Sequence, residues 1–175
     1  ILNDFNITRL GGAGCNLNPS GFQKFSYCSS LIKRMEKEIL ENSYDIIIIA
    51  NSFDEPLELN PNYINEILSY WSALSNKVIF FSPMIEFKNF KNSYILSGKS
   101  KFKLNDDSSR DFFKILESIN VPENVTILNT KEIFCGITNG DCLPIQNGKV
   151  FLTDDSHLSS TGAYEFGLQF KNILN

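Results

Sequence analysis

The run from Tyr44 to Ala50 is the feature that most restricts the fold of this chain. Its sequence, Tyr-Asp-Ile-Ile-Ile-Ile-Ala, is almost continuously apolar. A run of this kind is typical of a strand in a parallel sheet, where both faces are covered and no polar alternation is needed. Lys77 to Ser82 predicts a second buried strand, and Val125 to Asn129 predicts another. We therefore expect a parallel sheet.

Amphipathic stripes separate these strands, and their apolar residues recur at the spacing of a helix. The stripes are Leu31, Ile32, Met35, Ile39 and Leu40; Ile64, Ile67, Leu68, Trp71 and Leu74 behind Pro61; Phe112, Phe113, Leu116 and Ile119; and Ala163, Phe166, Phe170 and Ile173. Strands that alternate with helices predict an α/β fold.

The remaining stretches are expected to be less regular. The polar segment from Pro83 to Asp107 and the stretch that holds Cys135 and Cys142 both predict loops, and a short last strand is expected at Val150 to Leu152. Ile7 to Leu10 predicts a short strand that enters a glycine loop.

The length and charge of the chain limit the number of domains and the classes of partner that we expect. A chain of 175 residues without repeat or linker predicts one domain over 1–175. Its net charge of -4 offers no basic field for phosphate backbones, which argues against nucleic acid as a partner. The longest apolar run, Ile46 to Ala50, is far shorter than the ~20 residues that cross a bilayer. The chain opens without Met or a signal peptide, which suggests a fragment.

Four cysteines fall as two close pairs, Cys15 with Cys28 and Cys135 with Cys142. Three pairings are possible in principle, and pairing between neighbours is the simplest. We expect two disulfides and hence an oxidising compartment. Free thiols are the alternative, and the count leaves a four-cysteine metal site open, although no C-x-x-C spacing supports one. We assign no metal.

The segment Asp154-Asp155-Ser156-His157 lies between the last expected strand and the last expected helix, and it holds the one histidine of the chain. At the carboxyl end of a strand such groups face the ligand crevice of an open α/β sheet. Asp154, three residues before His157, is placed to orient the imidazole as a general base. The alternative is that this segment only begins a helix, with Ser159 or Ser160 as its cap.

Two further segments are candidates for an oxyanion hole. Gly14 ends a glycine loop in which a backbone N–H can approach an anion closely. Asn51 or Ser52, directly after the long isoleucine run, is a candidate second donor. Ordinary turns explain both segments equally well. A dinucleotide fingerprint fails, because the run from Gly12 lacks the third glycine of G-x-G-x-x-G.

In this order the three segments resemble the blocks of the SGNH, or GDSL-like, hydrolases, which are Ser-His-Asp esterases and acyltransferases with a flavodoxin-like α/β sandwich. Ile7 to Gly14 resembles the second block, Ala50-Asn51-Ser52 stands where the third is expected, and Asp154 to His157 matches the fifth, D-x-x-H. A closer likeness is to the SGNH domain fused behind acyltransferase-3 membrane domains in bacterial surface-polysaccharide O-acetyltransferases. Those domains similarly show two close cysteine pairs and a D-D-S-H-L-S segment.

The resemblance implies that Asp154 orients His157 and that Gly14 with Asn51 or Ser52 holds the oxyanion. It also implies a nucleophilic serine in a first block, Gly-Asp-Ser, which these 175 residues lack. We expect that block, with its strand, upstream of Ile1. The 175 residues alone are then expected to be inactive.

The expected function is extracytoplasmic O-acetyl transfer to a cell-surface carbohydrate, with acetyl-CoA as the ultimate donor. The partner is a membrane acyltransferase domain in the same polypeptide, and this domain itself needs no cofactor. Alternatives are a carbohydrate esterase of the same fold and a noncatalytic glycan-binding domain.

Overall fold

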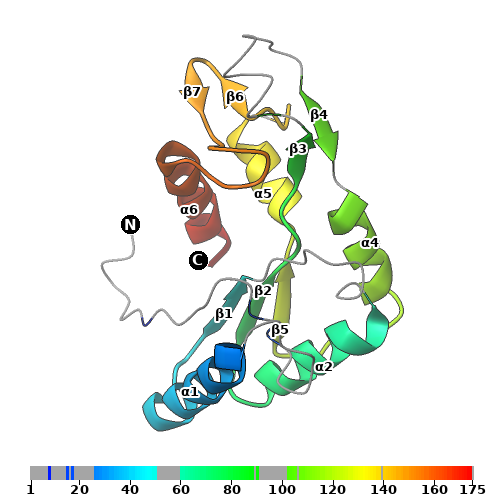
Figure 1. Ribbon diagram of the computed structural model, residues 1–175, viewed down its shortest axis with the longest axis vertical. Helices are drawn as coiled ribbons and strands as arrows, with labels where there is room; N and C mark the ends of the chain where they lie inside the picture. Colours follow the sequence, from blue (N-terminus) through cyan, green and yellow to red (C-terminus); the bar gives the residue numbers. More distant parts are fainter. Residues whose placement is uncertain are drawn as a thin grey trace. The chain divides into compact units, whose positions relative to one another are not determined.

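A computed structural model describes residues 8, 15, 17, 26–50, 60–88, 90, 102–105, 107–138 and 140–174. The chain divides into two compact units (Figure 1). The sheet unit comprises Phe5–Pro83 and Arg110–Leu128. The histidine unit comprises Ile1–Asp4, Met84–Ser109 and Asn129–Asn175.

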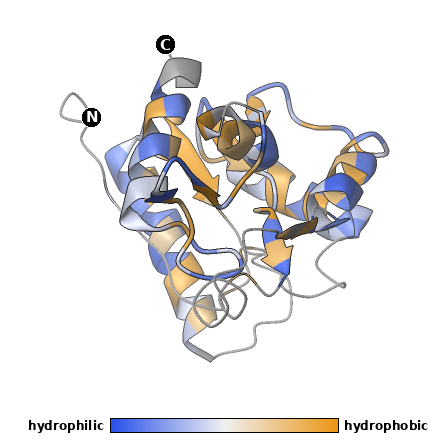
Figure 2. Cartoon of the chain, turned by 90° about the horizontal axis from the view of Figure 1, so that it is seen from above, coloured by the Kyte–Doolittle hydropathy of each residue, from blue (hydrophilic) through white to orange (hydrophobic). Residues whose placement is uncertain are grey.

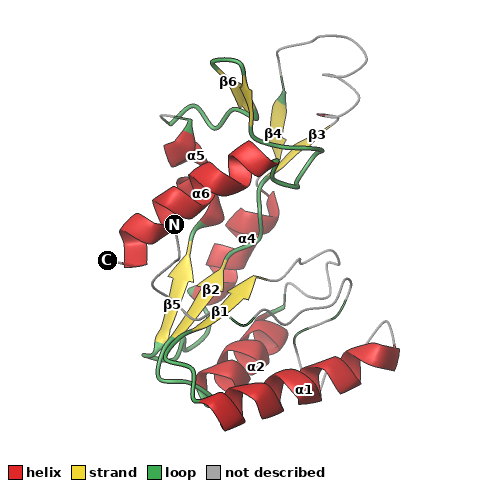
Figure 3. Cartoon of the chain, turned by 90° about the vertical axis from the view of Figure 1, so that its left-hand side faces the viewer, coloured by secondary structure: helices red, strands yellow, loops and turns green. Residues whose placement is uncertain are grey.

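Three parallel strands form the centre of the sheet unit. They are β1 (Ile47–Ala50), β2 (Val78–Phe81) and β5 (Val125–Leu128), in the order β1-β2-β5. Val78 of β2 pairs with Ile47 on one side and Val125 on the other. The three arrows point the same way in Figure 3. The expected parallel sheet and α/β class are confirmed.

Three helices accompany these strands: α1 (Ser26–Asn42), α2 (Pro61–Ser72) and α4 (Asp107–Leu116), the last of which begins in the histidine unit. The side chain of Asn60 caps α2 by accepting a hydrogen bond of 2.8 Å from the Tyr63 N–H. Proline fits the first turn of a helix, where its missing N–H would have no partner, so Pro61 begins α2.

The apolar faces of these helices and strands form one core. Figure 2 shows the helices divided into hydrophilic and hydrophobic sides. The buried members of the core are Ile32, Ile39, Ile49, Tyr63, Ile64, Ile67, Leu68, Trp71, Val78, Phe80 and Phe112. The indole N–H of Trp71 also donates to the carbonyl of Leu17 at 3.0 Å.

Two residues in the sheet unit depart from the sequence prediction. Leu40, expected on the buried stripe of α1, is 61% exposed. Ile48 is 51% exposed, although its strand was expected to be covered on both faces. Side chains alternate between the faces of a strand, so Ile49 enters the core while Ile48 points away from it.

The histidine unit corrects the prediction that Pro83 to Asp107 is a surface loop. This segment contains β3 (Glu86–Lys88) and β4 (Lys103–Asn105), which pair antiparallel. Phe87 and its neighbours Ile85 and Phe90 are buried in a second core with Phe134, Phe151 and Leu152. Apolar side chains inside a polar segment were enough to form this core.

The expected loop around Cys135 is also wrong, because Cys135 lies in the helix α5 (Thr130–Ile137). The side chain of Asn129 caps this helix by accepting from the Lys131 and Glu132 N–H groups at 3.1 and 3.4 Å. The cap satisfies donors that the first turn leaves without partners, and so stabilises a helix of only 8 residues.

The expected strand Val150 to Leu152 does not join a parallel sheet among the described residues. Instead β6 (Ile145–Gln146) and β7 (Lys149–Val150) form an antiparallel hairpin. Its turn residues Asn147 and Gly148 have positive φ angles of 53° and 75°, as a type I′ turn requires. Leu152 makes an isolated antiparallel bridge with Leu158.

The last helix, α6 (Ser160–Leu174), begins where Gly162 lies against the backbone of Phe151. A Cβ atom at position 162 would overlap the Phe151 carbonyl oxygen, so this close approach requires glycine. Ala163 was expected to point inward and is exposed. Among the described residues, no helix combines the length and apolar character needed to span a bilayer.

Candidate active site

The one histidine lies at the end of a short closed loop, Thr153 to His157, which we call the histidine loop. The Leu152–Leu158 bridge closes its base. The Thr153 N–H and hydroxyl both donate to the His157 carbonyl, at 2.8 and 3.2 Å. The backbone of His157 is therefore fixed on its carbonyl side.

The carboxylate of Asp154 organises the loop from within. Its Oδ1 accepts from the backbone N–H of Ser156 at 3.0 Å and of His157 at 2.8 Å. An aspartate often accepts from N–H groups two or three residues ahead, and the turn this produces brings the imidazole back to the carboxylate. His157 Nδ1 lies 2.9 Å from both Asp154 Oδ1 and Oδ2.

These contacts set the protonation of the pair. Partial burial alone would raise the pKa of the Asp154 carboxyl, but hydrogen bonds from the backbone of Ser156 and from the backbone and imidazole of His157 outweigh it and hold that pKa below its usual range. Asp154 is therefore ionised at neutral pH. Since a carboxylate only accepts hydrogen bonds, Nδ1 of His157 must carry a proton in this contact. In the neutral ring, Nε2 is then free to act as a base.

The pair is open to solvent. The side chain of His157 is 79% exposed and that of Asp154 is 39% exposed. Exposed ion pairs contribute little to stability, because water and salt screen them. The pair therefore contributes little to the free energy of folding.

A strand outside the D-x-x-H segment supports the loop from behind. The Phe87 N–H of β3 donates to the Asp155 carbonyl at 2.8 Å. Sequence reasoning missed this contribution because it assigned the segment to a surface loop. The alternation of apolar Ile85 and Phe87 with polar Glu86 and Lys88 is a strand signal that would have revealed β3, although not its bond to Asp155.

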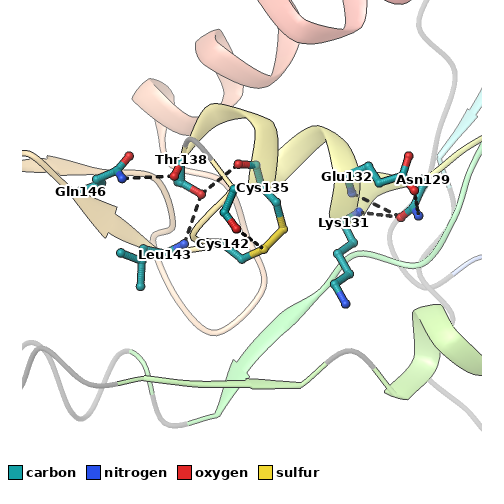
Figure 4. Close-up of a disulfide and its surroundings, with 9 residues drawn as sticks. Asn129, Lys131, Glu132, Cys135, Thr138, Cys142, Leu143 and Gln146 are labelled. Carbon is teal, nitrogen blue, oxygen red and sulfur yellow. Dashed lines mark hydrogen bonds between the residues drawn. A yellow bond between two sulfur atoms is a disulfide. The ribbon is translucent and has the colours of Figure 1, made fainter.

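Both expected disulfides form, Cys15 with Cys28 and Cys135 with Cys142, and no cysteine is free. The second joins α5 to the segment before β6 (Figure 4). Beside it, the fully buried Thr138 accepts from the Leu143 N–H at 3.3 Å through its hydroxyl, and its carbonyl accepts from Gln146 at 3.1 Å. All four cysteines of the chain are therefore used in disulfides.

The expected helix cap is also present. The Ser159 hydroxyl accepts from the Gly162 N–H at 3.0 Å at the start of α6. The cap of α6 and the Asp154–His157 contact therefore coexist in one segment.

The other predicted site residues, Gly14, Asn51 and Ser52, lie outside the described residues. Asn51 and Ser52 follow Ala50, the last residue of β1. That they and Gly14 converge on His157 as an oxyanion hole stays a prediction. Within the described part of the chain, no three or more His, Cys, Asp or Glu side chains are grouped as metal ligands.

The fold is similar to that of the periplasmic domain of a lipopolysaccharide acetyltransferase from Salmonella ser. Paratyphi A, with a TM-score of 0.64 and 18% identity over 93% of this chain and 69% of that one. A protein from Streptococcus pneumonia, provisionally named a platelet activating factor, aligns with a TM-score of 0.49 and 16% identity over 80% of this chain and 68% of that one. No curated protein matches the sequence.

A family model describes the chain over nearly its whole length. The model is the SGNH domain (fused to AT3 domains), and it matches residues 2–172. The expected SGNH-type α/β fold is confirmed by this match together with the solved neighbour. The chain belongs to the family of SGNH domains fused to AT3 domains.

Proposed function

We propose that this chain is the catalytic domain of a serine-dependent O-acyltransferase that transfers an acetyl group to a cell-surface carbohydrate outside the cytoplasm. The single observation that carries the proposal is the contact of His157 Nδ1 with the ionised Asp154 carboxylate, which leaves the lone pair of Nε2 available on a side chain that is 79% exposed. Membership of an SGNH family fused to acyltransferase domains supports acyl transfer as the reaction.

In the proposed reaction, Nε2 of His157 removes the proton from a serine hydroxyl as its oxygen attacks the acyl carbonyl carbon. The tetrahedral intermediate collapses, the bond to the donor group breaks, and the imidazolium returns its proton to that group. A sugar hydroxyl, deprotonated by the same nitrogen, then attacks the acyl carbon. The bond between the acyl carbon and the serine oxygen breaks, and the imidazolium returns its proton to that oxygen. Asp154 stabilises the imidazolium throughout.

The remaining parts of the site are proposed from the family pattern. The serine belongs to a Gly-Asp-Ser block that does not occur in these 175 residues. Gly14, with Asn51 or Ser52, would donate hydrogen bonds to the oxyanion. We place the donor chemistry in a membrane domain of the same polypeptide, which receives acetyl groups from acetyl-CoA.

Two observations support a location outside the cytoplasm. The two disulfides persist in oxidising compartments and are rare in the cytosol. The Salmonella protein of similar fold is described as a periplasmic domain of a lipopolysaccharide acetyltransferase, which also supports a carbohydrate acceptor.

The test uses the protein extended upstream of Ile1 by its natural sequence, assayed with an acetyl ester donor and an acceptor glycan. We expect acetylated glycan as the product. His157→Ala removes the base and Asp154→Asn disturbs its tautomer, so each should lower kcat by about 10³-fold or more while the fold is retained. Full activity of His157→Ala would refute the assignment.

The products also separate the alternatives. Free acetate without acetylated glycan would identify an esterase instead. Glycan binding without turnover would identify a noncatalytic domain. Ester turnover by the 175-residue chain at the rate of the extended protein would show that the nucleophile lies within these residues.

A further inference from the structure

Ser159, two residues after the candidate base, uses every polar group it has. Its N–H donates to the Phe151 carbonyl at 2.9 Å, and its carbonyl accepts from the Ala163 N–H at 2.7 Å. Its hydroxyl donates to the Val150 carbonyl at 2.6 Å and accepts from the Gly162 N–H at 3.0 Å. One half-buried side chain thus joins the segments on both sides of the histidine loop.

The hydroxyl has two separable tasks. As an acceptor it caps α6 through Gly162, which any N-cap residue would do. As a donor it ties Ser159 to Val150, on the opposite side of the base of the histidine loop. That tie continues the short antiparallel pairing made by the Leu152–Leu158 bridge and by the Ser159 N–H. Only a side chain with an O–H or N–H performs the second task.

The hydrogen bond from Ser159 to Val150 affects His157 because few other interactions hold its imidazole in place. The side chain is 79% exposed, and Asp154 is the only side chain among the described residues that makes a hydrogen bond to the ring. The place of Nε2 therefore depends on how firmly the backbone of the histidine loop is fixed. The backbone is fixed at its base by the pairing that the Ser159 hydroxyl completes.

We propose that Ser159 is a positioning residue for His157, and that it acts through its hydrogen bond to Val150 rather than through the cap of α6. The inference rests on the proposed function only in taking Nε2 of His157 as the base. The structural part, that the Ser159–Val150 bond holds the imidazole against Asp154, stands apart from any catalysis.

Three variants separate the two tasks. Ser159→Ala loses both the cap and the tie. Ser159→Asp keeps an acceptor for the Gly162 N–H, with a charge that suits a helix start, but has no donor for Val150. Ser159→Thr keeps both groups.

The readout is the tautomer of His157, measured from its ring ¹⁵N shifts at about pH 8.5, where an ordinary histidine is neutral. Because His157 is the only histidine of the 175 residues, its signals need no assignment. We expect the Nε2–H form to rise severalfold in Ser159→Ala and Ser159→Asp, and to stay at its original level in Ser159→Thr.

Asn129→Ala is the matched control. It removes the cap of another helix of the same unit, α5, without touching the histidine loop. It should lower the urea midpoint to an extent similar to Ser159→Ala, yet leave the tautomer ratio unchanged. A tautomer shift in Asn129→Ala, or a Ser159→Asp variant that behaves like the original protein, would overturn the proposal.

Kinetics in the extended protein give a second readout. We expect kcat to fall by about three- to tenfold in Ser159→Ala and Ser159→Asp with KM unchanged, which is the effect of one hydrogen bond lost from the reactive geometry. If His157→Ala keeps full activity, the proposed function fails whatever the tautomer does. If the tautomer ratio of His157 is the same in all Ser159 variants, the positioning role fails even though His157 is the base.

Discussion

In the sheet unit, α1 with 17 residues and α2 with 12 contribute to one apolar core with three parallel strands. In the histidine unit, β6 and β7 have two residues each, and side chains such as Thr138 and Ser159 bind backbone groups. The free energy gained by burying apolar surface is roughly proportional to the area buried and does not depend on the orientation of the groups. A hydrogen bond, by contrast, requires a particular orientation of its donor and acceptor. Each unit has an apolar core and a disulfide, but the candidate base lies in the unit whose shortest strands depend on local hydrogen bonds from side chains to the backbone.

The largest expected loss of stability is in the sheet unit. Trp71→Ala empties a fully buried site and removes the bond to Leu17, so the free energy of unfolding should fall by about 3–5 kcal/mol. Leu40→Ala, at an exposed position of α1, should change it by less than about 0.5 kcal/mol. Circular dichroism in urea measures both. Equal losses would show that the sheet unit does not depend on its core.

Removing a disulfide should cause the next largest loss in the free energy of unfolding. The place where hydrogen-exchange protection is lost should differ between the two units. Cys135→Ser with Cys142→Ser should cost about 2–4 kcal/mol, mainly because the unfolded chain gains freedom. We expect the loss of hydrogen-exchange protection to appear in α5 and the β6–β7 hairpin. For Cys15→Ser with Cys28→Ser it should appear in α1 instead. Protection lost uniformly in both units would mean that they unfold as one.

Two glycines of α6 give a smaller and sharper test. Gly162→Ala forces a Cβ against the Phe151 carbonyl and should cost about 1–3 kcal/mol. Gly167→Ala meets no atom within 4 Å and should stabilise the helix by about 0.5–1 kcal/mol. Urea midpoints of the two variants should therefore move in opposite directions. Movement in the same direction would contradict the close packing at Gly162.

The smallest expected effect is that the two units respond to opposite extremes of pH. The pKa of Asp154 is lowered in the folded protein, so its contribution is present above the ordinary value of 3.8 and is lost as pH falls through the folded value. Burial, then the Glu36 carboxylate, raises the pKa of Tyr70 from 10.0 to about 12, so its contribution is present below 10.0 and is lost as pH rises toward 12.

Hydrogen exchange after brief acid or alkaline exposure measures this contrast. We expect Asp154→Asn to reduce the acid sensitivity of the histidine unit, and Tyr70→Phe to reduce the alkaline sensitivity of the sheet unit. Solvent screening keeps the first effect small, because the Asp154 side chain is 39% exposed. If the pH dependence of hydrogen-exchange protection is unchanged in both variants, the two units do not differ in this way.

The sheet unit could largely be predicted from sequence, because its strands and helices are long enough for periodicity to show. The Ile47–Ala50 strand and the stripe from Ile64 to Trp71 were both found. The misplacement of Leu40 and Ile48 has one cause: a residue's hydrophobicity does not reveal whether another element covers it. Burial is decided by packing partners that lie far away in sequence.

Apart from α6, the elements of the histidine unit are short, and this made them harder to predict. For α5 a signal existed, since Asn129 followed three residues later by Glu132 is a capping pattern, and Asn129 donates to Glu132 at 3.0 Å. The contact of Asp154 with His157 was found because it depends only on spacing within one turn. The Phe87–Asp155 bond joins segments far apart in sequence, and no local pattern specifies it.

The exposure of Ile48 has a consequence for how this chain behaves at high concentration. β1 is an outer strand among the three described strands, and its Ile48 is 51% exposed in the described part of the chain. Such strands are templates for pairing with a second molecule and so promote aggregation. Asp45, which is exposed two residues before β1, carries a charge of the kind that opposes such pairing. Removal of this charge is therefore expected to increase self-association of the chain at high concentration.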